Sequence, residues 1–417
     1  MSQHRPSVII LYHFFYPDDV VSARHFSQFA EELAKRGWHV TVLTSNRYCR
    51  NTKKKIFKRN ELWQGIQIIR IRRPAWDQTK RFLRLANSAW MTIAWGLKLC
   101  KLPRADVIII GSDPQFSALL FPILRILKRG RLLVHWCYDL YPEAIIADGA
   151  KGFVKWIAEK LTILMRWAYH SVDLMVDIGA CMKKRLNTYH HNAHSATLVP
   201  WALVELDAIQ KPDDITRYEL FNDAKLALLY SGNMGKAHDF SPILQLARRL
   251  YRENPKIVFC FACRGNRFGE LTKAVRPNDY NIRFAPFAKE HEISKRLISA
   301  DIHLLSLRPE WEGIVVPSKF FGSLAVGRPV LYTGPEGSAI YKWIQEFNIG
   351  MVLNKDNMED VVNELLNIAN QPDKMRVWQE NAFQAYKYFS KTHVVNQWDI
   401  LLRNLMNNKD CHRGIIL

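Results

Sequence analysis

The sequence has 417 residues, of which 48% are hydrophobic and 24% charged, and a formal net charge of +20 at pH 7. This composition excludes a disordered chain, and the length predicts two domains of about 200 residues, each with a substantial core. Every apolar run is interrupted before about 18 residues, and the seven cysteines form no dense framework, which excludes transmembrane helices and a disulfide scaffold.

The first half of the chain alternates short apolar runs with segments of helical periodicity. Strand-like runs begin at Ser7, His39, Gln67, Asp106 and Arg131. This alternation is typical of a doubly wound parallel α/β sheet, so we expect residues 1–200 to form a first Rossmann-like domain. The apolar start is soon broken by Pro17 and lacks a small-residue cleavage site. We interpret it as the first strand of a cytoplasmic protein.

Polar residues follow several of these strands, where ligands of such sheets bind. They are Asp18, Ser22 and Arg24 after the first strand, Asp113 after the strand that begins at Asp106, and Asp139 and Glu143 in YDLYPE. All are candidates for acceptor binding, and Asp139 is also a candidate proton acceptor. Structural roles stay open, with Asp139 capping a turn and the first group forming an ordinary helix start. The segment lacks the paired glycines of a nicotinamide-binding fingerprint.

Positive charge is concentrated at residues 47–59 and 70–84, and the second run leads into a segment that contains Trp90 and Trp95. Basic residues beside interfacial tryptophans favour an anionic membrane surface. The alternative is a solvated basic loop followed by an ordinary core helix. Nucleic acid is the weaker candidate partner, because no base-stacking repeat, zinc-finger spacing or similar motif accompanies the charge.

The second half repeats the pattern of strands and helices after a lapse at residues 200–224, which we interpret as the interdomain connection. Residues 201–388 are therefore predicted to form a second Rossmann-like domain that faces the first across a cleft. Residues 389–417 are predicted to be a helical tail that frays. Cys260 and Cys263 lie in a strand-like run, and a structural role in the core is favoured over metal binding.

A glycine-rich turn follows the first strand of this second half. Gly232, Asn233 and Gly235 let a phosphate approach the backbone, and Lys236 supplies positive charge. His238 and Asp239 are expected in the first turn of the next helix, where they either cap it or contact a donor molecule. A turn of this kind alone is weak evidence.

A second loop, at residues 312–319, strengthens the prediction. Glu312 precedes the segment Gly313, Ile314, Val315, and a helix is predicted to start at Ser318 and Lys319. The free N–H groups of such a loop and of a helix N-terminus suit a diphosphate, and the acid suits sugar hydroxyls. Glu312 and Lys319 as plain surface residues are the alternative. If both loops emerge at one sheet edge, the sequence predicts a nucleotide-sugar site.

Four segments carry a family resemblance over nearly the whole chain: FFYPDDVVSARHFSQFAEELAKRGWHVTVLTS, DLYPE, LYSGNMGKAHDF and EGIVVPSKFFGSLAVGRPVL. They resemble the family-4 glycosyltransferases with the GT-B fold, particularly the WbuB-like bacterial enzymes. The resemblance implies a retaining enzyme that needs no metal or other cofactor. It implies that the second domain binds the nucleotide sugar, with Glu312 at the sugar and Lys236 at the diphosphate, and it adds Arg264 as a phosphate or nucleotide contact.

The sequence departs from the family pattern at several positions: Lys236 lacks the Arg and Lys pair of better-known relatives, and Arg264 stands where a glycine is common. Many relatives have a second glutamate eight residues after the first, where this chain has Phe320, and many have a histidine where it has Asp139. The expected function is transfer of a sugar, from UDP-sugar or a similar donor, to a lipid-linked or surface-polysaccharide precursor at the inner face of the membrane. The rival functions are a nucleotide-sugar epimerase of the same fold and a non-catalytic anion-binding scaffold.

Overall fold

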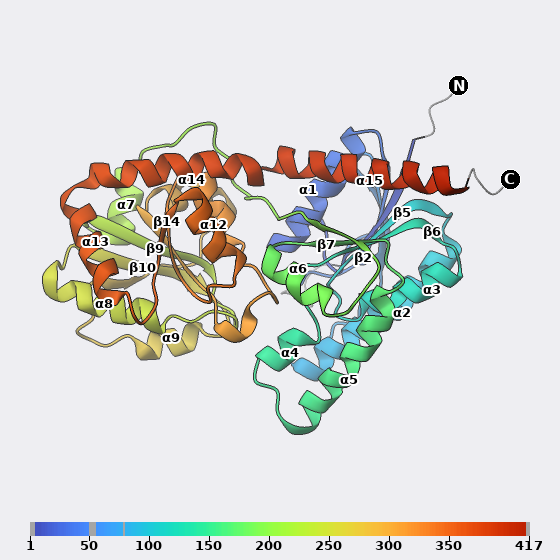
Figure 1. The fold of residues 1–417 in the computed structure, drawn as a ribbon, viewed down its shortest axis with the longest axis horizontal. Coiled ribbons are helices and arrows are strands. Elements are labelled where there is room, and N and C mark those ends of the chain that lie inside the picture. Colours follow the sequence, from blue (N-terminus) through green and yellow to red (C-terminus); the bar gives the residue numbers. More distant parts are fainter. Residues whose placement is uncertain (1–4, 50–55, 78–79, 414–417) are drawn as a thin grey trace. The chain divides into compact units, whose positions relative to one another are not determined.

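The computed structural model describes residues 5–49, 56–77 and 80–413 (Figure 1). The chain divides into two compact units. Unit 1 consists of Met1–Val199 and Val394–Leu417, and unit 2 of Pro200–His393. Each unit contains one largely parallel sheet with helices on both faces, which is the doubly wound architecture that the alternating sequence pattern predicts.

Unit 1 is built on an eight-stranded sheet of order β3-β4-β2-β1-β5-β6-β7-β8. All pairs are parallel except β3 with β4. The strands are β1 Ser7–Leu11, β2 His39–Ser45, β3 Asn60–Trp63, β4 Ile66–Ile71, β5 Ala105–Gly111, β6 Gly130–Trp136, β7 Leu174–Asp177 and β8 His194–Thr197. The strand order reverses between β1 and β5, so the carboxyl ends of these two strands are where a ligand is expected.

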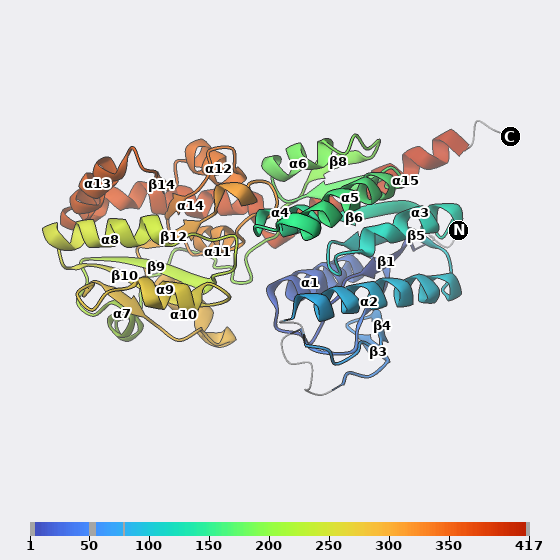
Figure 2. The same cartoon turned by 90° about the horizontal axis from the view of Figure 1, so that it is seen from below.

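The helices of unit 1 lie on both faces of this sheet. They are α1 Val21–Lys35, α2 Arg81–Lys101, η1 Ser117–Leu119, α3 Leu120–Ile126, α4 Glu143–Ala147, α5 Gly152–Tyr169, α6 Ala180–Asn187 and α15 Lys391–Arg413. Figure 1 shows α1 and α15 along one face and α2, α3 and α5 along the other, and Figure 2 views the unit from the α5 side. Right-handed crossovers in both directions from the switch point produce this division.

The last helix, α15, is part of unit 1 and does not form a separate tail. Trp398 is fully buried, and its ring centroid lies 5.1 Å from that of Phe29 in α1 and 5.0 Å from that of Trp136 in β6. Asp399 accepts a hydrogen bond of 2.6 Å from Nε1 of Trp38. The sequence predicted the helix, but not that the helix would complete the core of the first domain.

Unit 2 has a six-stranded, entirely parallel sheet of order β11-β10-β9-β12-β13-β14. Its strands are β9 Leu226–Asn233, β10 Ile257–Arg264, β11 Ile282–Phe284, β12 Ile302–Ser306, β13 Val330–Thr333 and β14 Gly350–Val352. The order reverses between β9 and β12, so a ligand is expected at the carboxyl ends of that pair.

The helices of unit 2 complete the second doubly wound layer. They are α7 Asp214–Phe221, α8 Ser241–Glu253, α9 Phe268–Ala274, η2 Glu290–Glu292, α10 Ile293–Ile298, η3 Pro309–Trp311, α11 Lys319–Ala325, α12 Ala339–Phe347, α13 Met358–Asn370, η4 Pro372–Met375 and α14 Arg376–Phe389. Part of the predicted interdomain connection is one of these helices. Asp213 caps α7 by accepting the Thr216 N–H, and Arg217 pairs with Asp301 at 2.7 Å, which holds α7 against unit 2.

The two tryptophans of the region that is predicted to contact a membrane differ in exposure. Trp95 is fully buried in the core, so it cannot touch a bilayer, whereas Trp90 is half exposed and donates Nε1–H to the Arg72 carbonyl at 2.8 Å. Helical periodicity places these two residues on different sides of α2. Lys53, Lys54 and Lys55 of the first basic run lie outside the described residues.

Candidate functional site

The loops that follow β9 and β12 meet at the carboxyl edge of the unit 2 sheet, at its switch point. The Arg308 N–H donates to the Ala237 carbonyl at 2.8 Å, and Nδ1–H of His238 donates to the Ser306 carbonyl at 2.7 Å. The glycine-rich turn and the 312–319 segment are thus brought to one edge, as the sequence analysis required for a shared site.

Lys319, the first residue of α11, joins these two loops directly. Its ammonium donates to the Asn233 carbonyl at 2.8 Å and lies 3.3 Å from Nε2 of His238. Its side chain crosses Gly232, where an added Cβ would lie 2.8 Å from the Lys319 Cε atom. Gly232 also has φ +129°, a conformation that favours glycine. Glycine at 232 is therefore needed both for the backbone and for the lysine.

Burial sets the protonation states of this cluster. It lowers the pKa of Lys319 to about 8. Burial, with the nearby charge of Lys319, lowers the pKa of His238 to about 3. His238 is therefore neutral at pH 7, with Nδ1 as donor and Nε2 as acceptor, and it orients the lysine. Two of the three ammonium N–H bonds are directed at protein partners, and the third can be donated to an anionic ligand.

His238 and Asp239 do not lie in the helix, as the sequence analysis expected, but before it. Helix α8 starts at Ser241 with Pro242 in its first turn, a position that proline favours. Asp239 accepts the Ser241 N–H at 3.0 Å and so has the structural role of stabilising the turn. His238 is consequently a residue of the loop, which is why it can reach Ser306 and Lys319.

Glu312 lies directly after η3, and its side chain reaches the loop after β13. A Cβ added to Gly337 would overlap Oε1 of Glu312, so the carboxylate rests against that backbone. The neighbouring loop is less open than predicted, because the Ile314 N–H donates to the Trp311 carbonyl at 3.0 Å and is not available to a ligand. Gly313 is buried with φ +70°, Val315 is half-buried, and Ser318 is exposed immediately before α11.

Several cations surround this edge of the sheet. Arg264 ends β10 beside Asn233, with its guanidinium 3.7 Å from the centroid of the Phe287 ring. Its buried Nε atom has no hydrogen-bond partner among the described residues. Lys236 is half-buried in the loop with Gly235. Sequence reasoning missed Arg267, whose guanidinium donates to the His238 carbonyl, and Arg308, although both closely follow strands that end at this edge.

Phe320 occupies the position where many relatives have a second acid. It is fully buried, and its ring stacks on that of Trp343 with centroids 5.3 Å apart. A carboxylate here would have to enter an apolar aromatic cluster, which is unfavourable. The fold of α11 therefore agrees with the absence of a glutamate at this position.

Unit 1 has its own polar cluster at the β1 and β5 switch point. Nδ1 of His13 lies 3.0 Å from Oδ1 of Asp113, and Asp139 follows β6 nearby. Burial, with the charge of Asp113, raises the pKa of Asp139 to about 7. The cluster unites Asp113 and Asp139, which the sequence singled out, with His13, which it missed. The sequence feature that could have indicated His13 is its position two residues after the first strand.

The other candidate acceptor residues lie in different surroundings. Asp18 is buried and accepts the N–H groups of Cys49 and Val20, at 2.6 and 3.3 Å. Glu143 accepts the hydroxyl hydrogen of Tyr189 at 2.5 Å. A structural role fits both acids better than acceptor binding. Ser22 and Arg24 are half-buried in the first turn of α1.

Metal ligation has no candidate in the part of the chain that the structure describes, where no group of three or more His, Cys, Asp or Glu side chains could hold an ion. Cys260 and Cys263 are both buried in β10. The chemistry that the described side chains offer is electrostatic binding in unit 2 and proton transfer in unit 1.

Comparisons with known proteins show which proteins this chain resembles. Residues 22–201 match the glycosyl transferase 4-like domain family. The chain is 25% identical over 252 residues to the probable glycosyltransferase WbjE of Pseudomonas aeruginosa, an alignment that spans 59% of this chain and 62% of WbjE, less than two thirds of that relative. It is 23% identical over 376 residues to the putative colanic acid biosynthesis glycosyl transferase WcaI of Escherichia coli (strain K12), covering 85% of this chain and 90% of WcaI.

Solved structures show the same fold. WaaG, a glycosyltransferase involved in lipopolysaccharide biosynthesis, aligns with a TM-score of 0.63 at 17% identity and covers 96% of this chain and 98% of its own. HepE of Anabaena, solved in complex with UDP, aligns with a TM-score of 0.65 at 10% identity and covers 95% of this chain and all of its own. The two doubly wound units and these matches show that the chain has the GT-B fold of these glycosyltransferases, and that residues 22–201 are similar to the glycosyl transferase 4-like domain.

Proposed function

We propose that the chain is a retaining glycosyltransferase that moves a sugar from a nucleotide sugar, most simply a UDP-sugar, to a lipid-linked or surface-polysaccharide precursor. The observation that carries the proposal is the placement of Lys319 over Gly232 at the switch point of the unit 2 sheet. The names of WcaI, WaaG and the HepE complex with UDP support the choice of polysaccharide precursor and donor.

In this proposal unit 2 holds the donor. The diphosphate lies at Gly232 and receives a hydrogen bond from Lys319, with Lys236 and Arg264 as further positive charges and Ser318 at the start of α11. Glu312 accepts hydrogen bonds from the hydroxyls of the sugar. When the bond between C1 and the diphosphate oxygen breaks, the nucleoside diphosphate leaves with the electron pair. The cations stabilise the charge that develops there, an effect worth several kcal/mol in comparable sites.

Unit 1 provides the acceptor chemistry. The attacking hydroxyl must lose a proton as it bonds to C1, and a carboxylate with a pKa near 7 can accept one at neutral pH. Asp139 has such a pKa because it is buried near Asp113. We assign it to the acceptor hydroxyl, with His13 and Asp113 as the neighbouring polar pair.

The described helices include none that is both long enough and apolar enough to span a bilayer. We propose that the protein acts at the inner face of the cell membrane as a peripheral protein. The net charge of +20 supports an anionic partner surface. A lipid-linked precursor would present its hydroxyl at such a surface.

Thermal unfolding in the presence of UDP, GDP, ADP, dTDP and CMP tests donor binding first, because a ligand of the native state raises the unfolding temperature. We expect the largest rise with UDP. Glu312→Ala should then abolish most transfer to a membrane-lipid extract while leaving the unfolding temperature nearly unchanged. A fully active Glu312→Ala variant overturns the role of this residue. Release of an epimerised sugar from donor alone supports the epimerase instead.

A further inference from the structure

Helix α5 has an unusual distribution of apolar side chains. Seven large apolar residues are exposed, namely Val154 at 50% and a further six: Phe153, Trp156, Ile157, Ile163, Leu164 and Trp167. The side that packs on unit 1 is much smaller and consists of Ala158, Met165, Ala168 and Tyr169. An ordinary surface helix buries its large apolar residues and exposes polar ones. The outer side of α5 therefore needs a second apolar environment.

The six residues other than Val154 form one stripe. Together with Lys160, they recur at intervals of three and four residues along α5, which places them on a single helix face. The Phe153 and Trp156 rings stack with centroids 5.7 Å apart, and Nζ of Lys160 lies 5.8 Å from the Trp156 centroid. The two tryptophans are 53% and 55% exposed. Tryptophan and lysine together are the residues that anchor helices at a membrane interface.

Two neighbouring helices extend this surface. Helices α2 and α3 cover the same side of the sheet as α5, and α3 packs against α5 (Figures 1 and 2). They expose Trp90, Ile93 and Leu97 from α2 and Ile123 and Ile126 from α3. The three helices carry eight lysines and arginines and a single acid, Glu159. The surface is therefore apolar and strongly basic, which we call the α5 face.

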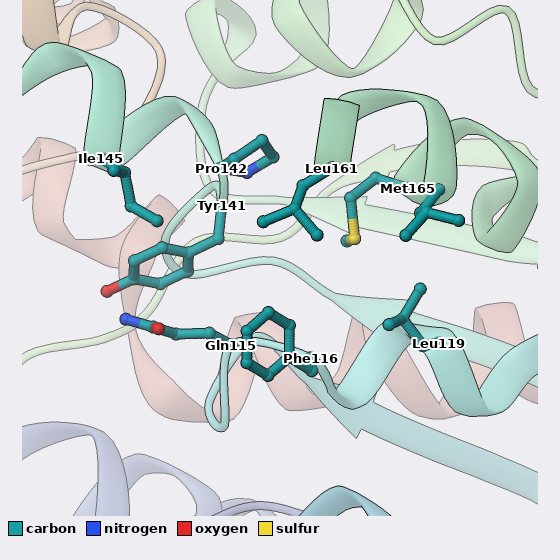
Figure 3. Close-up of a pocket in the computed structure, with 9 residues that line it drawn as sticks. Gln115, Phe116, Leu119, Tyr141, Pro142, Ile145, Leu161 and Met165 are labelled. Atoms are coloured by element: carbon teal, nitrogen blue, oxygen red, sulfur yellow. The ribbon is translucent and has the colours of Figure 1, made fainter. Parts of the chain in front are cut away.

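A small pocket with a mostly apolar lining lies beside the α5 face (Figure 3). Its lining includes Leu119, Ile145, Leu161 and Leu164. Leu164 belongs to the exposed stripe as well. The pocket shares Gln115, Tyr141 and Met165 with an equally small polar recess that is lined by Asp139. The stripe therefore lies close to the acid assigned to the acceptor hydroxyl.

We propose that the α5 face docks on an anionic lipid bilayer, with α5 in the interfacial layer. The proposal rests on the membrane association proposed above and names the surface responsible. A bilayer satisfies both properties of the face, because its interior covers the apolar stripe and its anionic headgroups pair with the lysines and arginines. A second copy of the chain would bring like charges together, so it is the poorer occupant.

Vesicle flotation with the full-length protein tests the docking. The wild type should float with vesicles of phosphatidylglycerol and phosphatidylcholine, and much less with phosphatidylcholine alone or in high salt. Trp156→Glu with Trp167→Glu should reduce the bound fraction about tenfold or more. The matched control places glutamates at two exposed apolar residues of unit 2, Ile215 (71% exposed) and Val377 (56% exposed), and should float as the wild type does.

A second variant, Lys155→Glu with Lys160→Glu, changes only exposed charges and should also reduce binding to the anionic vesicles. Wild-type flotation of both double variants overturns the proposal. So does a wild-type dimer in solution that either α5 variant converts to a monomer, because the face would then be a protein interface. UDP binding measured on the same samples checks that each variant is folded. If the wild type floats with the vesicles but does not bind UDP, the proposed function is wrong and the proposal that the α5 face docks on a bilayer still stands.

Discussion

Lys319 is the residue whose ionisation should govern donor binding. Its pKa of about 8 in the free protein results from burial, and the ammonium form is the one that attracts a diphosphate. Below pH 8 the charge is present, and above pH 8 it is lost. We therefore predict a dissociation constant for UDP that is constant near pH 7 and increases up to about tenfold per pH unit above pH 8. Isothermal titration between pH 7 and 9.5 measures it.

Two lysine variants show whether this pH dependence comes from Lys319. Lys319→Met should bind UDP about 10- to 100-fold more weakly and lose the inflection near pH 8, since a charged hydrogen bond is removed. Lys273→Met changes an exposed lysine of α9 and should reproduce the wild-type curve. An unchanged inflection in Lys319→Met would assign the titration to another group.

A substitution at Gly337 tests the role of Glu312 without replacing the acid itself. An alanine Cβ at 337 would occupy the position of Oε1 of Glu312, so Gly337→Ala must displace the carboxylate. We expect the turnover rate to fall about 100-fold, as for loss of one transition-state contact, with little change in UDP affinity. Gly269→Ala, where a Cβ meets nothing within 4 Å, is the control.

A double variant that combines Gly337→Ala with Glu312→Ala shows whether the two substitutions act through one interaction. If Gly337→Ala acts through Glu312, the double variant with Glu312→Ala should be no slower than Glu312→Ala alone. Rates that multiply in the double variant would mean that Gly337 acts independently of the acid.

The raised pKa of Asp139 should make the free energy of unfolding depend on pH. Its carboxyl pKa rises from 3.8 to about 7 because the group is buried near Asp113. Between these values the folded state binds more protons than the unfolded state, so ionisation destabilises the fold as pH rises through this window. Asp139→Asn should therefore be more stable than the wild type by about 1–3 kcal/mol at pH 8, and by much less at pH 5. Urea unfolding at both pH values measures it, with the exposed Asp207→Asn as control.

Among single residues, those defined by local rules were predicted best. Gly232 lies near the end of a strand and Lys319 opens a helix after a proline, and each position is visible in the sequence. Roles that depend on distant contacts were not. Asp18 bonds to Cys49 across two loops, and Glu143 bonds to Tyr189 in the turn after α6. Neither partner is indicated by spacing, so both acids looked like candidates for ligand binding.

At the scale of elements, α15 completes the core of unit 1 although it comes last in the sequence. Substitutions in α15 should therefore change the stability of unit 1. Trp398→Ala removes a fully buried ring from its contacts with Phe29 and Trp136 and should destabilise unit 1 by about 3–5 kcal/mol. Ile400→Ala, on the same helix but 53% exposed, should cost about 0.5 kcal/mol or less. Equal stability of the two variants would show that α15 is a dispensable tail.

Helix α5 shows why elements are predicted more easily than their surroundings. Its apolar residues indicate a helix, but they occur all round it, and periodicity alone does not say which side faces the protein. The sequence analysis also predicted that Trp90 and Trp95 both contact a membrane, whereas Trp95 is fully buried in the core. The sequence predicted a basic and aromatic membrane surface in the first domain, and the surface that we propose is centred on α5 and not on the loop before α2.

For the whole molecule, the alternation of strands and helices was sufficient to predict two doubly wound units, because crossover rules leave few topologies for such a pattern. The location of both polar clusters followed from the same rule, since each lies where the strand order of its sheet reverses. His13, Arg267 and Arg308 were missed because a single charged or aromatic residue after a strand carries no motif. They became visible only when the strands were placed side by side.

The central claim is that the loops after β9 and β12 bind one diphosphate together, through Lys319. Isothermal titration of the full-length protein with UDP at pH 7, compared between the wild type, Lys319→Met and Lys273→Met, tests it most directly. We expect saturable binding by the wild type and Lys273→Met, and binding at least about tenfold weaker by Lys319→Met. Equal affinity of all three proteins for UDP would contradict it.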